Sequence, residues 1–402
     1  DANTNGIKGD YSKITVFNLS GSTHLKLQKS ITLAGSTEFK HLSAGTKLEA
    51  LAPDAGVSLL SGMTVNGTGT TIINGLKDNV SNDLSSINSD GNHTDVTATI
   101  VANMATGLKG DYSTVDNITV ADNVTVPIPS SGLTLPTPHG TVGRMVLLGA
   151  NSTVTAAEMS YLDGKRITAA SAGLGKIQIV AHANDSGQTY DLEGLGTTTI
   201  LGECKLTISD DFTLNANIKN FSSINFAPGA ANKTLSLATG TQLPGSSIGE
   251  IQATGVNAGT STVSGEADFF SGKKITGVGK VLATKYVAQD LSSLLNTGTT
   301  EVSADGANVT LSGDFSGVDQ FSVLDNQNLT ISDSATPFTG TTKKFLLKGG
   351  ASKVIGKALK LHDVKIEADT SGQGVVEVNE LATGSAAVDL SNISSNIGSS
   401  KL

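Results

Sequence analysis

The chain lacks tryptophan, has one cysteine and contains only 8 prolines in 402 residues. The single Cys204 has no second cysteine for an intramolecular disulfide, and one thiol does not make a structural zinc site. Charged residues are 16% of the chain and aromatic residues 4%, whereas an ordinary globular protein is roughly 25% charged. With so few aromatic rings, the core is expected to consist of Val, Ile, Leu and Ala, which suits thin, regularly layered β structure.

The chain is acidic, with a net charge of −9 and a pI near 5.1. Because an acidic surface repels phosphate groups, neither a nucleic acid nor an anionic membrane is an expected partner. No apolar run approaches the roughly 18 residues of a membrane-spanning helix, so membrane insertion is not expected. The chain starts at Asp1 with no signal peptide, which we interpret as a processed or excised product.

Motifs for common enzyme chemistry are missing. The six histidines show no metal-site spacing, and the sequence has no P-loop. The phrase Gly245-Ser246-Ser247-Ile248-Gly249 has the form Gly-x-Ser-x-Gly, but it lacks the preceding strand and following helix that a nucleophile elbow needs. The sequence therefore predicts a protein that is not an enzyme and has no catalytic residues.

What the chain does contain is a recurring phrase of the form Gly-Asp-aromatic-Ser. Its aspartates lie 101, 100 and 103 residues apart, at Asp10, Asp111, Asp211 and Asp314, and at Asp211 the phrase varies to Asp-Asp-Phe-Thr. A second phrase, Asp-Leu followed after two intervening residues by Ile or Leu, recurs at a similar interval, at Asp83, Asp191, Asp290 and Asp389. Two phrases with one period predict a tandem array. The predicted units are residues 1–100, 101–200, 201–303 and 304–402.

Secondary-structure signals are almost entirely of period two. Apolar residues alternate with Ser or Thr in residues 117–120 and 329–332, and Asp, Asn and Gly separate such segments, which predicts short half-buried strands. Helical periodicity is confined to residues 154–162 and 263–270, where we expect at most short helices. Variable segments rich in Ser, Gly and Pro interrupt the pattern, as in residues 127–138.

The predicted fold class is all-β, and two architectures fit the pattern. One is a β-solenoid with turns of about 20–25 residues. The other is a string of β-sandwich domains, which usually have a buried aromatic anchor. Short strands, dense Asn/Asp/Gly turns and the absence of tryptophan favour the β-solenoid.

The repeated aspartates are the candidate metal ligands. Calcium prefers carboxylate and carbonyl oxygens, so Asp10, Asp111, Asp211 and Asp314 are candidates for binding it. The alternative is an Asx turn, in which the carboxylate accepts a backbone amide two residues later. If calcium is bound, its chelation is expected to lower the melting temperature, because a ligand of the folded state stabilises that state. No other cofactor is expected.

In style, the chain resembles the β-strand-repeat proteins of prokaryotic surfaces, namely S-layer proteins and large repetitive adhesins. Residues 309–319 and 118–126 carry this resemblance, which implies an extracellular structural role. Residues 155–164 are similar to a phrase in the shafts of phage tail fibres. A related phrase at residues 264–272 makes this segment part of the internal repeat.

The resulting hypothesis is a secreted structural protein that forms a cell-surface layer, filament or adhesive stalk by self-association. The alternatives are a shaft protein like that of phage tail fibres and a carbohydrate-acting β-helix enzyme, which needs paired carboxylates in one groove. Residues 14–19 and 390–397 carry no charge, so they would form unprotected β edges. We expect these edges to be covered head to tail, by another copy or by a continuing array.

Overall fold

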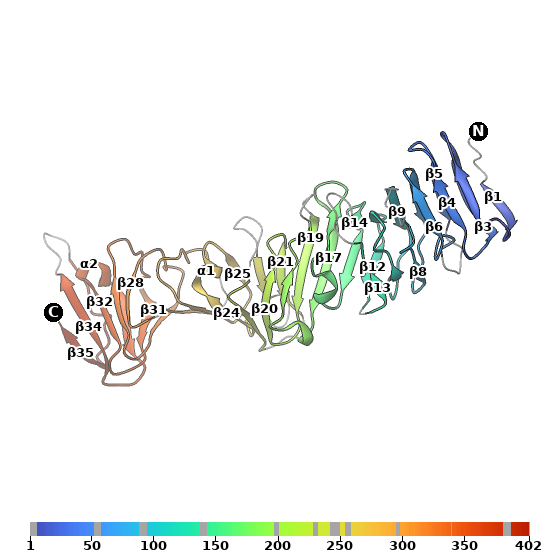
Figure 1. Ribbon diagram of the computed structural model, residues 1–402. Coiled ribbons are helices and arrows are strands. Elements are labelled where there is room, and N and C mark those ends of the chain that lie inside the picture. Colours follow the sequence, from blue (N-terminus) through green and yellow to red (C-terminus); the bar gives the residue numbers. More distant parts are fainter. Residues whose placement is uncertain are drawn as a thin grey trace. The chain divides into compact units, whose positions relative to one another are not determined.

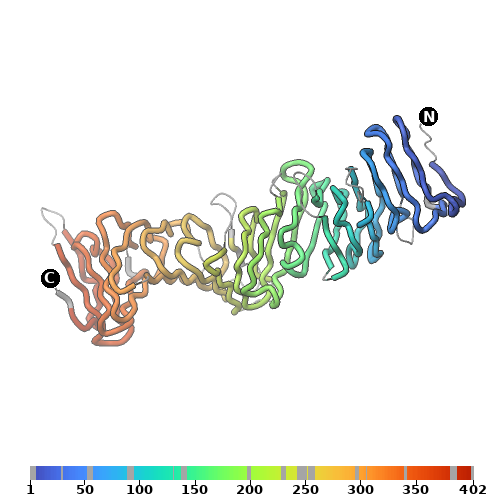
Figure 2. Tube along the Cα trace, viewed as in Figure 1, coloured from blue at the N-terminus to red at the C-terminus, as the bar shows by residue number. Residues whose placement is uncertain are grey.

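A computed structural model of the chain describes residues 6–51, 58–87, 95–129, 131–136, 143–196, 201–227, 232–241, 250–253, 259–294, 298–304, 306–338, 340–380 and 387–401. Strands pair in parallel, and each pairs with the strands one turn before and one turn after it. The fold is an all-β parallel β-solenoid of about 15 turns, with about 23 residues per turn, and the turns follow one another along the chain (Figure 2).

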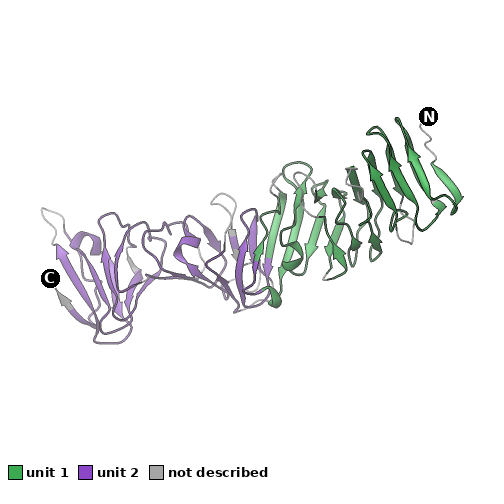
Figure 3. Cartoon of the chain, in the orientation of Figure 1, with its two compact units in different colours: residues 1–185, 190–206 green, residues 186–189, 207–402 purple. Residues whose placement is uncertain are grey.

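The predicted β-solenoid is therefore confirmed, and its turn length lies in the expected range. The alternative of β-sandwich domains is wrong, because sandwich sheets are antiparallel while these strands pair in parallel. The division into four units of about 100 residues stays a prediction. The structure forms two compact units, residues 1–185 with 190–206 and residues 186–189 with 207–402 (Figure 3).

Unit 1 contains the N-terminal turns of the solenoid (Figure 1). Its longest sheet has the order β1 (Ile7–Tyr11), β3 (His24–Leu33), β5 (Lys47–Leu51), β7 (Thr70–Asn74), β9 (Asp95–Ile100), β11 (Asn117–Val120), β14 (Arg144–Leu147), β16 (Ile167–Ala169). The other faces carry three shorter rows: β2 (Val16–Leu19), β4 (Glu38–His41), β6 (Thr64–Gly67); β8 (Ser81–Asp83), β10 (Lys109–Asp111), β13 (Leu133–Thr134); and β12 (Thr125–Ile128), β15 (Thr153–Ala156), β17 (Leu174–Ala181).

Unit 2 is built in the same way. Its longest row has the order β20 (Phe212–Asn217), β22 (Thr234–Leu237), β24 (Thr262–Glu266), β26 (Lys280–Thr284), β27 (Thr299–Ser303), β29 (Gln320–Val323), β31 (Gly340–Leu347), β33 (Val364–Ala368). Two further rows are β21 (Ser223–Phe226), β23 (Glu250–Ala253), β25 (Lys274–Thr276), and β28 (Asn308–Leu311), β30 (Asn328–Ile331), β32 (Lys353–Lys357), β34 (Gln373–Glu380), β35 (Ile397–Lys401). Strands β18 (Thr189–Asp191) and β19 (Leu201–Ile208) contain residues of both units.

The period-two pattern forms strands because it buries one column of side chains per face. In unit 1, Ile118 pairs with Met145 and Met145 with Ile167, and all three side chains are buried. Each buried aliphatic side chain of this size contributes about 1.5–3 kcal/mol relative to an exposed one. Stacked columns of this kind hold one turn on the next.

Aromatic rings contribute more to the core than the composition suggested. Five rings pack together in unit 2: Tyr286, Phe315, Phe321, Phe338 and Phe345. Phe315 lies at their centre, with its ring centroid 5.5 Å from that of Tyr286 and 5.7 Å from that of Phe321. The expectation of a core made only of Val, Ile, Leu and Ala is therefore wrong for unit 2.

The helices are short, as expected. They are η1 (Ser160–Leu162) and η2 (Ala183–Asp185) in unit 1 and α1 (Ala267–Phe270) and α2 (Ala358–Leu361) in unit 2. In each of η1, α1 and α2 the last residue is buried, and a left-handed residue follows two positions later: Gly164 (φ +63°), Gly272 (φ +64°) and Asp363 (φ +57°). No helix among the described residues is long and apolar enough to span a membrane.

Candidate functional site

The repeated sequence phrases meet at one corner of the solenoid, on consecutive turns. In unit 1 the Gly62 amide donates to the Asp83 carbonyl at 2.7 Å, and the Leu84 amide donates to the Asp111 carbonyl at 2.8 Å. In unit 2 the Gly272 amide donates to the Asp290 carbonyl at 2.9 Å, and the Leu291 amide to the Asp314 carbonyl at 2.7 Å. The phrases look like separate markers in the sequence, but they occupy the same corner of the solenoid on successive turns.

The candidate aspartates cap this corner. The carboxylates of Asp10, Asp111 and Asp314 each accept the backbone amide two residues later at 2.9 Å, so the Asx-turn interpretation is confirmed for these three. The hydroxyl and the amide of Ser12 lower the pKa of Asp10. Asp211 differs, because its carboxylate accepts the Thr234 amide at 2.7 Å, from the next turn.

The four calcium candidates are not brought together by the fold. Asp111 lies beside Asp83 on the preceding turn, and Asp10, Asp211 and Asp314 lie on other turns. Within the part of the chain that the structure describes, no group of three or more His, Cys, Asp or Glu side chains is placed to hold a metal ion. Calcium binding stays a prediction from the sequence. The phrase at residues 245–249 lies outside the described residues.

Acidic side chains gather around Tyr190 in unit 1. Burial, followed by the hydrogen bond with the Asp185 carboxylate and the charges of Asp163 and Glu158, raises the pKa of Tyr190 to about 12. Asp185 is 1% exposed and accepts the backbone amide of Met159 at 3.0 Å. Its carboxylate therefore serves to join two turns, which is a structural role.

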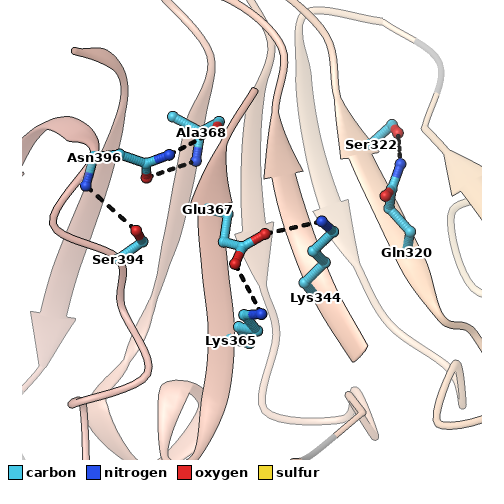
Figure 4. A network of polar contacts seen from close by, with 8 residues as sticks. All are labelled: Gln320, Ser322, Lys344, Lys365, Glu367, Ala368, Ser394 and Asn396. Atoms are coloured by element: carbon cyan, nitrogen blue, oxygen red, sulfur yellow. Dashed lines mark hydrogen bonds and ion pairs between the residues drawn. The ribbon is translucent and has the colours of Figure 1, made fainter. Parts of the chain in front are cut away.

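Ion pairs on the outer face of unit 2 also join turns. Glu367 accepts Lys344 and Lys365, each at 2.8 Å, and these two lysines lower its pKa. On the next turn, the Asn396 side chain donates to the Ala368 carbonyl at 2.9 Å and accepts the Ala368 amide at 3.2 Å (Figure 4). These charged and polar groups satisfy one another across neighbouring turns.

His41 is a buried polar group in unit 1. It is 3% exposed, and its ring nitrogens lie 2.7 Å from the Thr46 hydroxyl and 3.1 Å from the Thr71 hydroxyl. Burial lowers the pKa of His41 below its ordinary 6.5. A side chain on Gly69 would overlap the His41 ring, so the ring packs directly against the Gly69 backbone.

We expect this histidine to make unit 1 acid-sensitive. Because the unfolded chain takes up a proton near the ordinary pKa of 6.5 while the folded ring resists it, the stabilisation is complete above that pH. The stabilisation decreases as the pH falls from 6.5 to the pKa of His41 in the folded protein. The loss is about 1.4 kcal/mol for each unit by which the folded and unfolded pKa values differ. Urea unfolding followed at pH 7.5 and 5.5 measures it. The control His41→Gln, which keeps hydrogen-bonding capacity but does not titrate, should show a smaller loss; equal losses in both proteins would contradict the expectation.

A pocket of about 290 Å³ lies in unit 1. Part of its lining comes from β12 and β13, two neighbouring labels in Figure 1. Its apolar lining comes from the variable segment, with Ile128, Pro129, Leu133 and Leu135. The opposite side comes from η1 and the corner after it, with Ser160, Tyr161 and Lys165. Sequence reasoning did not single out these residues. The one available signal was the interruption of the strand pattern at residues 127–138.

Comparisons with protein-family models, curated proteins and solved structures find no match to this chain. The structure by itself defines the class of protein, which is the parallel β-solenoid.

Proposed function

We propose that the chain is a secreted structural protein that builds a cell-surface layer, filament or adhesive stalk by stacking solenoid ends from copy to copy. The observation that carries the proposal is the pair of edge strands. β1 and β35 are the outermost strands of their sheets, and the Ile14 and Val16 side chains beside β1 are 42% and 41% exposed. Unpaired β edges with apolar neighbours favour the addition of another strand.

The use of polar groups inside the chain supports a scaffolding role. The backbone bond from Leu291 to the Asp314 carbonyl, the Lys344–Glu367 ion pair and the Asn396 hydrogen bonds all connect one turn to the next. An extracellular location and self-association follow from this proposal. A contact between two different ends does not close on itself, so it grows a filament or, with lateral contacts, a layer.

Gly9 offers a test of end-to-end stacking. It precedes Asp10 as Gly110 precedes Asp111, and both glycines have a positive φ, +115° and +109°. A Cβ on Gly110 would overlap the backbone of Asn82 on the preceding turn, whereas a Cβ on Gly9 meets, among the described residues, only the Tyr11 ring at 3.9 Å. If a turn from another copy stacked on β1 in the way that the turn with Asn82 stacks on β10, a Cβ on Gly9 would have no room.

We therefore expect Gly9→Ala to abolish assembly while the monomer stays folded, at a local backbone cost of about 1–3 kcal/mol. Assembly is followed by light scattering and electron microscopy as the protein is concentrated. The control is Gly35→Ala, since a Cβ at Gly35 meets nothing within 4 Å; it should assemble like the original protein. Filaments from Gly9→Ala, or a dispersed monomer of the original chain at every concentration, would overturn the proposal.

A further inference from the structure

The pocket beside β12 and β13 combines an apolar floor with a polar rim. Two hydroxyls come from the variable segment, Ser131 and Thr134, and the facing corner supplies Ser160, Tyr161 and Lys165. Its volume of about 290 Å³ is at the lower end of the roughly 300–1,000 Å³ typical of ligand pockets. A space of this size suits one small ring with several hydroxyl groups.

Among the described residues, Lys165 is the only cation that lines this pocket. No ion pair between the described residues involves its ammonium group, although many lysines on the chain are paired with Glu or Asp. In a protein with a net charge of −9, an unpaired ammonium in the lining of a pocket favours a ligand with a negative charge.

One of the equivalent corners in unit 2, the one after α2, shows a purely structural arrangement. The Gly164 amide donates to the Asp191 carbonyl at 2.9 Å, and the Asp363 amide donates to the Asp389 carbonyl at the same distance, so Lys165 corresponds to Val364. Val364 is 1% exposed. The ammonium of Lys360 donates to the Ala335 carbonyl at 2.8 Å and so bridges the two turns.

The segment facing each corner differs in the same way. Thr134 and Thr336 are equivalent, since their carbonyls accept the amides of Tyr112 and Phe315 at 2.9 Å and 3.1 Å. Two residues after Thr336, the Phe338 ring is 1% exposed and belongs to the aromatic cluster. Unit 2 therefore fills this corner with Phe338, Val364 and a bridging lysine, whereas unit 1 has a pocket with hydroxyls and a cation.

We propose that this pocket binds an acidic sugar, a single pyranose unit that carries a carboxylate, as found in anionic glycans. The carboxylate pairs with the Lys165 ammonium, and the ring hydroxyls bond to Ser131, Thr134 and Ser160. The apolar face of the sugar ring packs on Leu133 and on Tyr161, whose ring has an apolar body and a polar tip. A variable loop on a rigid repeat scaffold is a usual place for such a binding site.

The test is titration of the full chain with sodium glucuronate, followed by calorimetry and by saturation-transfer NMR. We expect one site, with glucose binding at least about tenfold more weakly, because it lacks the charge-assisted hydrogen bond. Lys165→Met should weaken glucuronate binding by about tenfold or more for the same reason. The matched control is Lys219→Met, which removes the same charge from an exposed position outside this pocket and should bind as the original protein does.

Each alternative result has a definite meaning. Absence of glucuronate binding, or equal binding by Lys165→Met and Lys219→Met, would overturn the proposal. Inorganic phosphate that competes as strongly as glucuronate would also overturn it, since the pocket would then recognise charge without the sugar. The site goes beyond the structural role, and titration of the non-assembling Gly9→Ala protein separates failure of sugar binding from failure of assembly.

Discussion

Replacing Phe315 with Ala is expected to lower the free energy of unfolding of unit 2 by about 3–5 kcal/mol. The Phe315 ring is fully buried, and four other aromatic rings lie around it, with centroids 5.5 to 6.2 Å away. Truncation removes the apolar area of the ring and leaves a cavity that rigid neighbouring turns do not fill. Because each turn contacts mainly its neighbours, the loss should be concentrated in residues 286–345.

Hydrogen exchange resolved by segment, together with urea unfolding, measures this effect. The control is Leu324→Ala in the same region, since the Leu324 side chain is 46% exposed; it should change stability by no more than about 0.5 kcal/mol. A loss below about 1 kcal/mol for Phe315→Ala would mean that the five rings do not form a packed core.

Gly110→Ala is expected to destabilise unit 1 by more than about 3 kcal/mol. Two causes add. The backbone of Gly110 has φ +109°, a conformation that L residues rarely adopt, and a Cβ would overlap the carbonyl oxygen and the amide nitrogen of Asn82. The Asn82 side chain donates to the Tyr112 hydroxyl at 2.9 Å and accepts the Ser58 amide at 2.7 Å, so displacing it disturbs three turns.

Gly9→Ala separates the two causes in the dispersed monomer. It has a similarly unfavourable φ, but no backbone of another described turn lies against it, so its cost should stay near 1–3 kcal/mol. The difference between the two variants measures the close approach of successive turns. Thermal and urea unfolding of both proteins give this difference, and equal losses would contradict the stacking argument.

Local secondary structure was predicted well from the sequence. Alternating apolar and Ser/Thr residues form strands such as β11 and β30, and the Asp-x-Ser phrases at Asp111 and Asp314 form Asx turns. Each depends on residues within a few positions of one another. Asp211 shows the limit, since its surrounding phrase is similar but its carboxylate caps Thr234 instead.

The equivalence of the repeated phrases was not predictable in the same way. Gly62, Asp83 and Asp111 are one corner on three consecutive turns, yet their spacings differ because the loops between strands vary in length. A period search detects the recurrence of each phrase separately. It does not show that different phrases occupy the same position, which depends on the register of strand pairing.

The sequence by itself determined the all-β class and the strand and turn segments, because these follow from period-two burial and from hydrogen bonds between near neighbours. It left two architectures open, and for the repeated aspartates it left the Asx turn and the calcium site as alternatives. Only the tertiary structure decided which turns stack, how the rings of unit 2 converge and where a pocket opens. Thr134 and Lys165 line one pocket although they are far apart in the chain. The register of stacked turns places them together, and that register is the sum of many weak column contacts that no single segment encodes.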